Sequence, residues 1–418
     1  MKNFKVVPLT LAVAASLASV STFANADVDA LLKRVEALES QQSSDVQFTG
    51  YARYGFHFEA DGNRYVGAAG QKAGNAAGRL GNETNGGEFQ FTKRFEGANG
   101  TKWDLNVMME NWWKMPGDVD GDIVGNADVF LKKFYAGVSN VFDAQPDLYI
   151  WAGRDFHQRP QEGLNDYFLM THDGQGAGFK NLDMGALKLD VGFVGQTDGS
   201  NWTGTGDSGN YALTSKLHGL SLGEGNNLDI YMNYGLSDDK SDSADVDEAF
   251  QVATVFDFSG KKLSLRYSTN SDNTAFNRTE GLDTIYASFQ SGISLGDKTS
   301  MDYQLAYHNS EYADNAAQDR TNYSVIVRPM HAWDDTHSTW LEAGYSLVDY
   351  DQANESNAAW KITVSQNMAI DSVPWGRPML RFYATAGEAD NKVNGDGVAV
   401  ASDKVDTFAV GAMFEAWW

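Results

Sequence analysis

Aromatic and basic side chains share one strand face at several points in the sequence. Tyr51 and Arg53 are two residues apart in the segment FTGYARYG, so in a strand both point to the same side. The same spacing places Trp375 and Arg377 together in PWGRPMLRF, and Trp417 stands near the end of the last apolar segment. Aromatic rings offer flat apolar surfaces and charged groups form strong hydrogen bonds, so these residues are candidates for a ligand-binding surface.

The acidic run GDVDGD is a second feature with chemical potential, because Asp118, Asp120 and Asp122 alternate in it. Closely spaced carboxylate oxygens are the ligands that calcium prefers. The run is not an EF-hand loop, since Gly121 comes too early and no Glu occupies the twelfth position. We therefore favour an acidic loop in solvent over a calcium site, and the sequence indicates no other cofactor.

Residues for catalysis or nucleic-acid binding are sparse. The chain has 7 His and no Cys, which excludes cysteine nucleophiles, thiolate zinc sites and disulfides. His157, His172, His308 and His337 have no evident serine partner, so no lipase or protease mechanism is indicated. With 56 acidic and 32 basic residues, the chain lacks the basic stripe that phosphate binding requires. The sequence predicts neither an enzyme nor a nucleic-acid-binding protein.

The chain begins with two segments that differ from the rest. A basic start, an apolar stretch and a small-residue cleavage site ending at Ala26 identify residues 1–26 as a secretory signal. Residues 27–44 then carry apolar side chains at heptad positions, namely Val28, Leu31, Val35 and Leu38. Two heptads are too short to be stable alone. The segment is therefore either a frayed terminal helix or a short periplasmic coiled coil on the axis of an oligomer.

From Val46 to the end of the chain, apolar residues recur with a period of two. About eighteen segments of roughly ten residues repeat this pattern, separated by turns rich in Gly, Asn and Asp. A soluble sandwich would have fewer and shorter strands. The 23 Phe, 18 Tyr and 11 Trp suit the aromatic girdles of a lipid-facing barrel. We predict an all-β fold, an 18-stranded antiparallel transmembrane barrel over residues 45–418 that is wide enough for an aqueous channel.

Several motifs along this region resemble those of the maltoporin family. They are FTGYARYG, GRLGNE at residues 78–83, WAGRDFHQRP at residues 151–160, GQGAGFKNLDMG at residues 174–185, PWGRPMLRF at residues 374–382 and the terminal Trp417-Trp418. The resemblance extends from Gln47 to the end of the chain. It implies a homotrimer of 18-stranded barrels, embedded in the lipids of the outer membrane of a Gram-negative bacterium. Such barrels conduct maltose, maltodextrins or related oligosaccharides by facilitated diffusion.

The resemblance also assigns roles to individual aromatic residues. It places Tyr51, Trp375 and Trp417 on an aromatic slide along the channel wall. A loop tryptophan, either Trp112 or Trp113, would reach into the neighbouring pore of the trimer. Phe258 is a weaker candidate for the slide. The alternative for each aromatic residue is a girdle position that faces lipid headgroups.

A polar track opposite the slide is implied in the same way. Arg53, Arg79, Glu88 and Arg159 match family positions that bind sugar hydroxyls, and Asp166 matches an acid on the constriction loop. Residues 154–178 are long and non-alternating, as expected of a loop folded into the barrel. The alternative for these charges is ordinary solvation in a water-filled lumen.

Three departures from the family pattern stand out. Phe168 occupies the place of a tyrosine at the narrowest point, and Gly86-Gly87 stand near the place of an aromatic residue on the second strand. The first loop also lacks the cysteine pair that several relatives use, since the chain has no Cys. The first two departures bear on which sugar is preferred and leave the pore itself unaffected. The heptad segment is also absent from the plain maltoporin pattern, and it is similar to a shortened periplasmic extension of sucrose porins.

Two transport functions remain open on the sequence. One is a sugar-selective passive channel, and the other is a general porin for small hydrophilic solutes and ions. In the second case the aromatic residues would be girdle residues and the charges would set only the ion preference. A role of the outer loops as an adhesin or phage receptor is compatible with either. Block of the ion current by oligosaccharides distinguishes the two channels.

Overall fold

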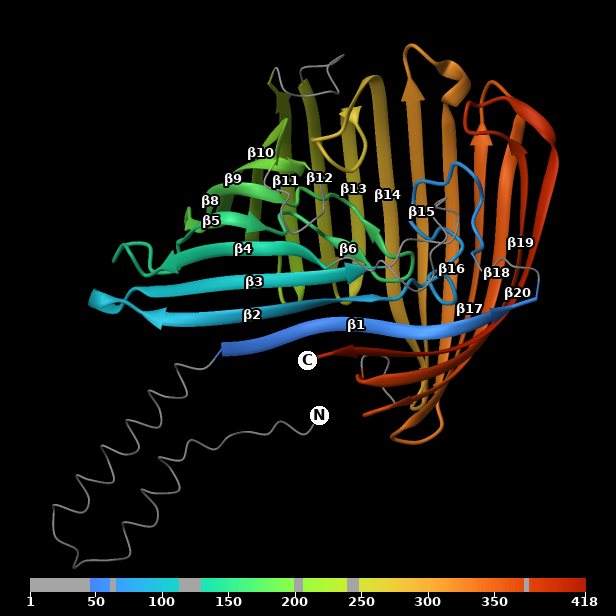
Figure 1. Cartoon of the computed structure of the whole chain (residues 1–418), viewed down its shortest axis with the longest axis horizontal. Coiled ribbons are helices and arrows are strands. Elements are labelled where there is room, and N and C mark those ends of the chain that lie inside the picture. Colours follow the sequence, from blue (N-terminus) through green and yellow to red (C-terminus); the bar gives the residue numbers. More distant parts are fainter. Residues whose placement is uncertain (1–45, 61–64, 113–128, 199–205, 239–247, 372–375) are drawn as a thin grey trace, which may run out of the picture.

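The computed structural model describes residues 46–60, 65–112, 129–198, 206–238, 248–371 and 376–418 (Figure 1). Its strands are β1 (Val46–Glu59), β2 (Gly86–Glu96), β3 (Lys102–Trp112), β4 (Phe130–Ser139), β5 (Tyr149–Asp155), β6 (Gln161–Glu162), β7 (Tyr167–Phe168), β8 (Gly174–Asp183), β9 (Lys188–Asp198), β10 (Gly206–Ser221), β11 (Asn226–Ser237), β12 (Glu248–Phe258), β13 (Lys261–Ser271), β14 (Arg278–Gly296), β15 (Thr299–Tyr312), β16 (Arg320–Ala332), β17 (His337–Tyr350), β18 (Glu355–Ala369), β19 (Met379–Val393) and β20 (Ala399–Trp417). Short 3-10 turns, η1 (Ala98–Gly100) and η2 (Ala316–Gln318), lie between strands.

Several predicted features lie outside the described residues. They are the signal at residues 1–26, the heptad segment at residues 27–44, the acidic run with Asp118, Asp120 and Asp122, and the side chains of Trp113 and Trp375. Within the described ranges, no helix has the length and apolar character needed to cross a membrane.

Eighteen of the strands form one closed antiparallel sheet. β1 pairs with β2 along one edge and with β20 along the other, so the first and last strands of the chain close the barrel. Closure leaves no strand edge with unpaired backbone groups, which is what a lipid environment demands. The prediction of an 18-stranded barrel is confirmed.

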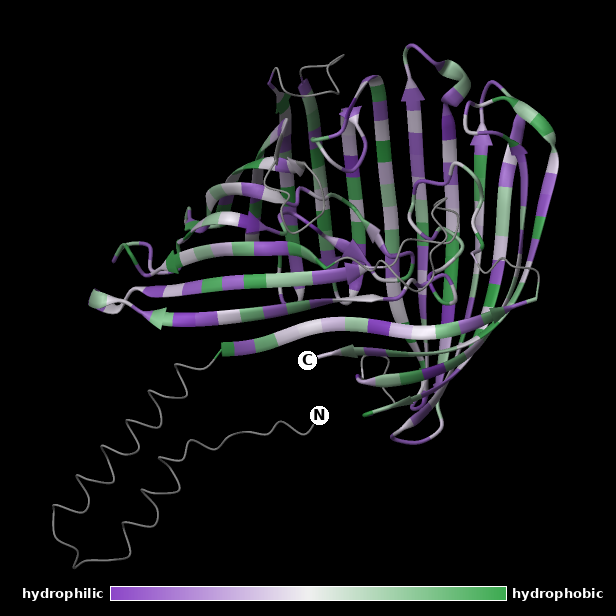
Figure 2. Cartoon of the chain, in the orientation of Figure 1, coloured by the Kyte–Doolittle hydropathy of each residue, from purple (hydrophilic) through white to green (hydrophobic). Residues whose placement is uncertain are grey.

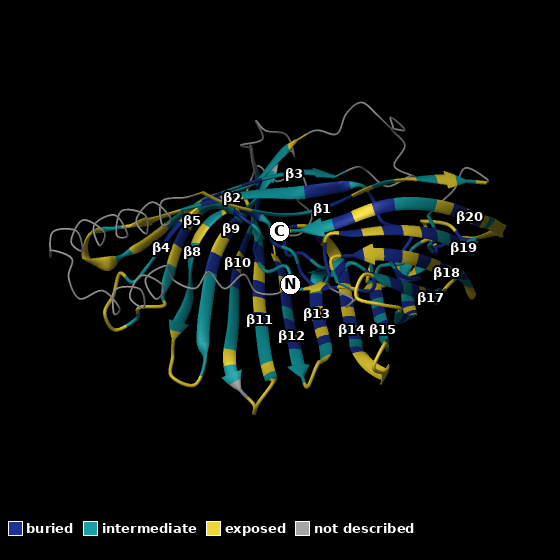
Figure 3. Cartoon of the chain, turned by 90° about the horizontal axis from the view of Figure 1, so that it is seen from below, coloured by how far each residue is buried: buried dark blue, intermediate teal, exposed yellow. Residues whose placement is uncertain are grey.

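The alternation of side chains explains why this sheet is a barrel wall. In β18, Trp360 and Ile362 are 42% and 45% exposed on the outer face, while Lys361 and Thr363 are 1% and 0% exposed on the inner face. The same alternation of apolar and polar residues runs along most strands (Figure 2), and burial alternates with it (Figure 3). An outer face of half-exposed apolar residues is stable against lipid and unfavourable in water.

Strand connections differ in length between the two ends of the barrel. At the end where β1 begins and β20 finishes, β12 and β13 are joined by residues 259–260 and β14 and β15 by residues 297–298. At the other end, the connections include residues 60–85 and 156–173. Outer-membrane barrels have short periplasmic turns and longer external loops. The end that carries both barrel termini is therefore the periplasmic end.

One long connection folds into the lumen and packs against the inner wall. In this inward loop A, residues 65–85, the backbone N–H of Leu80 donates to Glu342 Oε1 at 2.7 Å. Lys361 Nζ donates to the Leu80 carbonyl at 2.6 Å. Both partners lie on the lumen face of β17 and β18, so the wall holds the loop through buried polar contacts.

A second connection, inward loop B (residues 156–173), also enters the lumen. It contains the β6–β7 hairpin and is held against the inner face of β13 and β14. Tyr286 donates to Glu162 Oε2 at 2.6 Å, and Arg266 donates to the Tyr167 hydroxyl at 2.9 Å. These contacts tie the hairpin to β13 and β14.

The sequence predicted one inward loop over residues 154–178, and two corrections follow. Residues 154–155 extend β5 and residues 174–178 begin β8, so the loop itself is shorter. Inward loop A was not predicted. Its residues carry no periodic pattern, and its partners lie more than 200 positions further along the chain.

The two inward loops meet inside the barrel. The N–H of Asn75 donates to the Asn165 carbonyl at 2.7 Å, and the N–H of Arg79 donates to the Leu164 carbonyl at 3.0 Å. Both loops also contribute to one buried apolar cluster, which contains Ala73, Ala76, Tyr167, Leu169 and Met170. The loops therefore narrow the lumen together.

Candidate functional site

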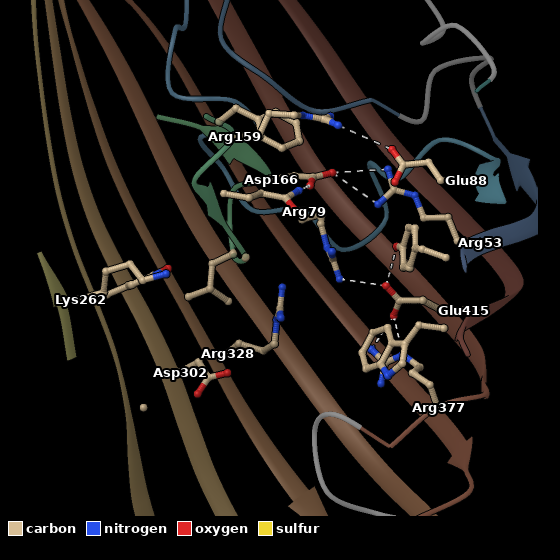
Figure 4. A pocket seen from close by; sticks show the side chains of 18 of the residues that line it. Arg53, Arg79, Glu88, Arg159, Asp166, Lys262, Asp302, Arg328, Arg377 and Glu415 are labelled. Atoms are coloured by element: carbon tan, nitrogen blue, oxygen red, sulfur yellow. Dashed lines mark hydrogen bonds and ion pairs between the residues drawn. The ribbon is translucent and has the colours of Figure 1, made fainter. Parts of the chain in front are cut away.

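A cavity of about 1090 Å³ lies in the lumen between the inward loops and the barrel wall (Figure 4). The predicted site residues that the structure describes all line it, namely Tyr51, Arg53, Arg79, Glu88, Trp112, Arg159, Asp166, Phe168, Arg377 and Trp417. They come from β1, β2, β3, β20, both inward loops and the connection before β19. We call this cavity the passage.

Three aromatic rings form a continuous row along one side of the passage. The ring centroids of Trp112 and Tyr51 are 6.0 Å apart with an interplanar angle of 29°. Those of Tyr51 and Trp417 are 6.4 Å apart with an angle of 24°. Tyr51 on β1 is the register partner of Trp417 on β20, so closure of the barrel builds this part of the row.

Gly86 explains how Trp112 enters the row. It begins β2 with φ +154°, and a Cβ atom there would lie 2.4 Å from Trp112 Cε3 and 2.4 Å from the Asn111 carbonyl oxygen. The second strand lacks its expected aromatic residue at this place. Glycine instead leaves space for the indole of the neighbouring strand, and Trp112 occupies it.

The structure bears on two expectations for aromatic residues. Trp112 stacks on Tyr51 in its own barrel, while Trp113 lies outside the described residues. Phe258 does not line the passage, because it shares the outward face of β12 with Phe256, whose ring lies 4.8 Å away. Asp257, between them, faces the passage instead.

Glu415 organises the groups below the aromatic row. Its carboxylate is 2% exposed and accepts a hydrogen bond from the Tyr51 hydroxyl at 2.8 Å. Arg377 donates to Glu415 Oε2 from Nε at 2.9 Å and from Nη2 at 2.5 Å. Arg79 and Arg381 each approach the same carboxylate at 3.3 Å. A buried carboxylate is stable only with such partners, and here it fixes the position of each.

The polar side of the passage begins at Arg53. Its Nε donates to the Thr84 carbonyl at 2.8 Å, and its Nη1 lies 3.4 Å from Asp166 on inward loop B. Its guanidinium also lies 5.1 Å from the centroid of Trp112. Arg53 thus connects the aromatic row with both inward loops.

Inward loop A contributes a second buried carboxylate, Glu83. Burial opposes its ionisation, but the neighbouring guanidiniums of Arg381 and Arg79 outweigh this effect and hold the pKa of Glu83 below its ordinary value. Arg381 Nη1 donates to Glu83 Oε1 at 2.7 Å. The loop is therefore anchored to β19 by a charged pair.

Inward loop B contributes one arginine and two aromatic rings to the passage. Arg159 lies 3.9 Å from Glu88 and 3.4 Å from Asp173. Its guanidinium carbon lies 3.9 Å from the ring centroid of Phe156 and 4.3 Å from that of Phe168. Cation–π contacts of this kind favour a fixed guanidinium. Phe168 therefore supports a polar group of the passage while its own ring lines it.

Sequence reasoning missed several residues that line the passage, including Lys262, Asp302, Arg328 and Trp340. The alternation contains a signal for Trp340, because Leu341 and Tyr345, which are 40% and 44% exposed, lie on the outer face of the same strand and Trp340 therefore lies on the inner face. No motif marked these positions, so nothing singled them out among other lumen residues. Within the part of the chain that the structure describes, no group of three or more His, Asp or Glu side chains could hold a metal ion.

Comparison with known proteins bears on the identity of this channel. A family model described as LamB porin matches residues 46–418. Maltoporins from El Tor and Classical strains of Vibrio cholerae serotype O1 are each 28% identical over 458 residues, and the matches cover 99% of this chain and 100% and 99% of theirs.

Solved structures of other barrels are also similar in outline. OpdQ of Pseudomonas aeruginosa has a TM-score of 0.48 and 12% identity, covering 90% of this chain and 99% of that chain. The trimer form of the outer-membrane protein OmpT of Vibrio cholerae has a TM-score of 0.42 and 10% identity, covering 90% and 99%. Because the family model spans every described strand, the chain belongs to the LamB porin family and forms a channel in the outer membrane of a Gram-negative bacterium.

Proposed function

We propose that this porin conducts oligosaccharides of the maltose and maltodextrin type by facilitated diffusion through the passage. The observation that carries the proposal is the continuous row of Trp112, Tyr51 and Trp417, which faces a lumen lined by charged groups. Maltoporins among its relatives support the same class of substrate.

The geometry suits the movement of a sugar chain in steps. Each aromatic ring offers a flat apolar surface to a pyranose face, and the centroids of neighbouring rings are 6.0 and 6.4 Å apart. Arg53, Glu88 and Arg159 offer donors and acceptors to the hydroxyl groups at the rim of each sugar ring. Conduction requires sites that are favourable enough to enter and weak enough to leave. A row of similar surfaces meets that requirement, because the next contact forms as the last one breaks.

The inward loops give the passage its selectivity. They meet across the lumen, so a solute cannot avoid the wall that carries the aromatic row. A wide, unobstructed barrel would pass small solutes without contact. Narrowing by both loops therefore supports a sugar-selective channel over a general porin.

Sugar block of the ion current in planar bilayers tests this proposal. In Trp417→Ala we expect block by maltotriose to weaken about fivefold or more, because a stacking surface is lost. Trp360→Ala is the matched control, since Trp360 faces outward and is 42% exposed. We expect block in the control to remain at the wild-type level. Equal block in both variants, or no block of the wild-type channel by any sugar, would indicate a general porin.

We also propose that three copies of the chain assemble into a homotrimer in the outer membrane, as the family resemblance implies. Cross-linking of the purified protein in mild detergent tests the number of copies. A dominant product of three chains is expected, and a limit at two chains would contradict the proposal.

A further inference from the structure

Basic side chains outnumber acidic ones in an ion-pair network beside the passage. The network consists of Arg79, Arg377, Arg381, Glu83 and Glu415, with Arg381 2.7 Å from Glu83 and Arg79 3.3 Å from Glu415. Three guanidiniums thus share two carboxylates. All five groups lie near the periplasmic end of the lumen.

A second network on the adjacent strands has the same bias. Arg328 lies 2.5 Å from Glu342, and Lys361 lies 3.9 Å from the same carboxylate. The two networks together hold five cations and three carboxylates, an excess of two positive charges in a chain whose formal charge is -24. When the Arg53–Asp166 pair and Asp302 near Arg328 are included, six cations face five carboxylates, so one positive charge remains and an anionic partner is stabilising there.

Trp340 joins the two networks. The guanidinium carbons of Arg328, Arg377 and Arg381 lie 5.8, 5.8 and 5.2 Å from its ring centroid. Trp340 is 2% exposed and lines the passage, yet its indole N–H has no acceptor among the residues that the structure describes. Buried donors in proteins are nearly always satisfied by protein or by water, so this N–H is available to water or to a solute in the passage.

The arginines present their charge to the passage. Arg79 from inward loop A and Arg328 from β16 point toward the same space from two sides, while Glu415 lies beside Arg79 and away from that space (Figure 4). Lys262 stands on the facing wall, and Asp302 lies near Arg328 (Figure 4). Guanidinium groups offer several N–H donors in one plane, which matches the oxygens of an oxyanion.

We propose that the passage binds an oxyanion group carried by its oligosaccharide, such as the carboxylate of a uronic-acid unit, between Arg79 and Arg328. The inference rests on the proposed function as a sugar channel and extends its substrates from neutral maltodextrins to acidic oligosaccharides. The uncharged rings of the sugar contact the aromatic row, and the oxyanion contacts the basic wall. The indole N–H of Trp340 supplies a further donor to the same group.

Block of the ion current compares three solutes at equal ionic strength: a uronic-acid trisaccharide, a neutral trisaccharide and inorganic phosphate. We expect half-maximal block by the acidic trisaccharide at about one-tenth of the concentration needed for the neutral one, as one charge-assisted contact provides. Equal block by the two sugars would overturn the inference and leave the sugar channel intact. Phosphate block as strong as that of the acidic sugar would also overturn it, because free anions would then suffice. No block by either sugar would reject the proposed function and this inference with it.

Substitutions test whether the preference for the acidic trisaccharide depends on the basic side of the passage. Arg328→Gln should remove most of the preference for the acidic sugar, while Glu342 keeps Lys361 as a partner. Trp340→Phe keeps the ring that supports the arginines and removes only the N–H, so it should reduce acidic block and spare neutral block. Lys216→Gln is the control, because Lys216 pairs with Asp229 at 2.8 Å and does not line the passage. A preference that persists in both Arg328→Gln and Trp340→Phe, with oligomer mobility unchanged, would overturn the assignment.

Discussion

At the scale of single residues, Phe168 offers a test of the expected constriction, because its ring carries no hydroxyl group. Its ring lies under the guanidinium of Arg159 and lines the passage. In Phe168→Tyr we expect sugar block of the ion current to strengthen about fivefold, since one hydrogen bond to a sugar hydroxyl contributes about 1 kcal/mol. Phe193→Tyr adds the same hydroxyl on the outer face, where Phe193 is 48% exposed, and should leave block unchanged. If the two variants give the same block, Phe168 does not contact the sugar.

Gly86 is a second residue whose effect can be predicted. A methyl group there would lie 2.4 Å from the ring of Trp112, and φ +154° is strained for any residue with a Cβ atom. In Gly86→Ala we expect Trp112 to leave the aromatic row and sugar block to weaken severalfold. The chain has 11 Trp, so the fluorescence of Trp112 cannot be separated from that of the others, and block of the ion current by sugar is the measurement.

The matched control for Gly86→Ala is Gly395→Ala, because a Cβ at Gly395 meets nothing within 4 Å. That variant should behave as wild type in the same bilayer assay. Unchanged block in Gly86→Ala would mean that Trp112 is not part of the sugar path.

Apart from Phe258, the expected residues that the structure describes line the passage, whether strand alternation, a family motif or both indicated them. Tyr51 and Arg53 share a lumen face by alternation alone, and a family motif marks the same strand. The expectation for Phe258 rests on the family resemblance alone, whereas the alternation along β12 turns Asp257 inward and Phe258 outward. Trp340 and Arg328 were missed because their contacts join β16 and β17 to the distant segment that holds Arg377 and Arg381, and no local pattern encodes such contacts.

At the scale of elements, two buried histidines make the docking of inward loop B sensitive to acid. Burial, with a contribution from Lys180, lowers the pKa of His157 to about 4. Burial and the neighbouring His157 lower the pKa of His172 to about 3. The N–H of Ala275 donates to His172 Nε2 at 3.1 Å, so this imidazole is neutral in the docked loop. Protonation of that nitrogen would remove the hydrogen bond.

The sign of the pH effect follows from these pKa values. In an undocked loop each imidazole titrates near 6.5, so between pH 6.5 and 4 the undocked form binds protons that the docked form excludes. Docking is therefore most favourable above pH 6.5 and weakens as the pH falls, by on the order of 3 kcal/mol for His157 at pH 4. Protease cleavage within residues 156–173 should accelerate over this range.

Substitution of one histidine tests that assignment. His172→Asn retains an acceptor for the Ala275 N–H but cannot be protonated, so the cleavage rate should depend less steeply on pH. His337→Gln, at the periplasmic start of β17 with a side chain that is 46% exposed, should keep the wild-type pH dependence. Identical pH profiles for all three proteins would exclude the histidines as the cause.

The strands could be predicted from the sequence and the inward loops could not. A period of two is a local property of each strand, and lipid on the outside enforces it along the whole barrel. The path of inward loop A depends instead on contacts such as that of Leu80 with Glu342 and Lys361, far along the chain. Such contacts exist only after the barrel closes, so no local sequence signal specifies them.

At the scale of the whole molecule, the passage is electrically unlike the chain that forms it. The formal charge of the chain is -24, yet the described lining includes seven basic and six acidic side chains. The basic ones are Arg53, Arg79, Lys132, Arg159, Lys262, Arg328 and Arg377, and the acidic ones are Glu88, Glu110, Asp166, Asp257, Asp302 and Glu415. The net charge of the sequence therefore does not predict the ion preference of the channel, because local lining charges set it.

Because the barrel closes without residues 27–44, we expect these residues to contribute little to the assembly of the oligomer or to conductance. β1 begins at Val46 and pairs with both β2 and β20. The first residue of the aromatic row along the chain is Tyr51. The heptad segment lies outside the described residues, and we expect two heptads to add little to the contact between barrels. We predict that deletion of residues 27–44 leaves an oligomer with wild-type conductance and sugar block. Native gel mobility in mild detergent and bilayer recordings measure both properties. A truncated protein that migrates as a monomer would show instead that the heptad segment holds the copies together.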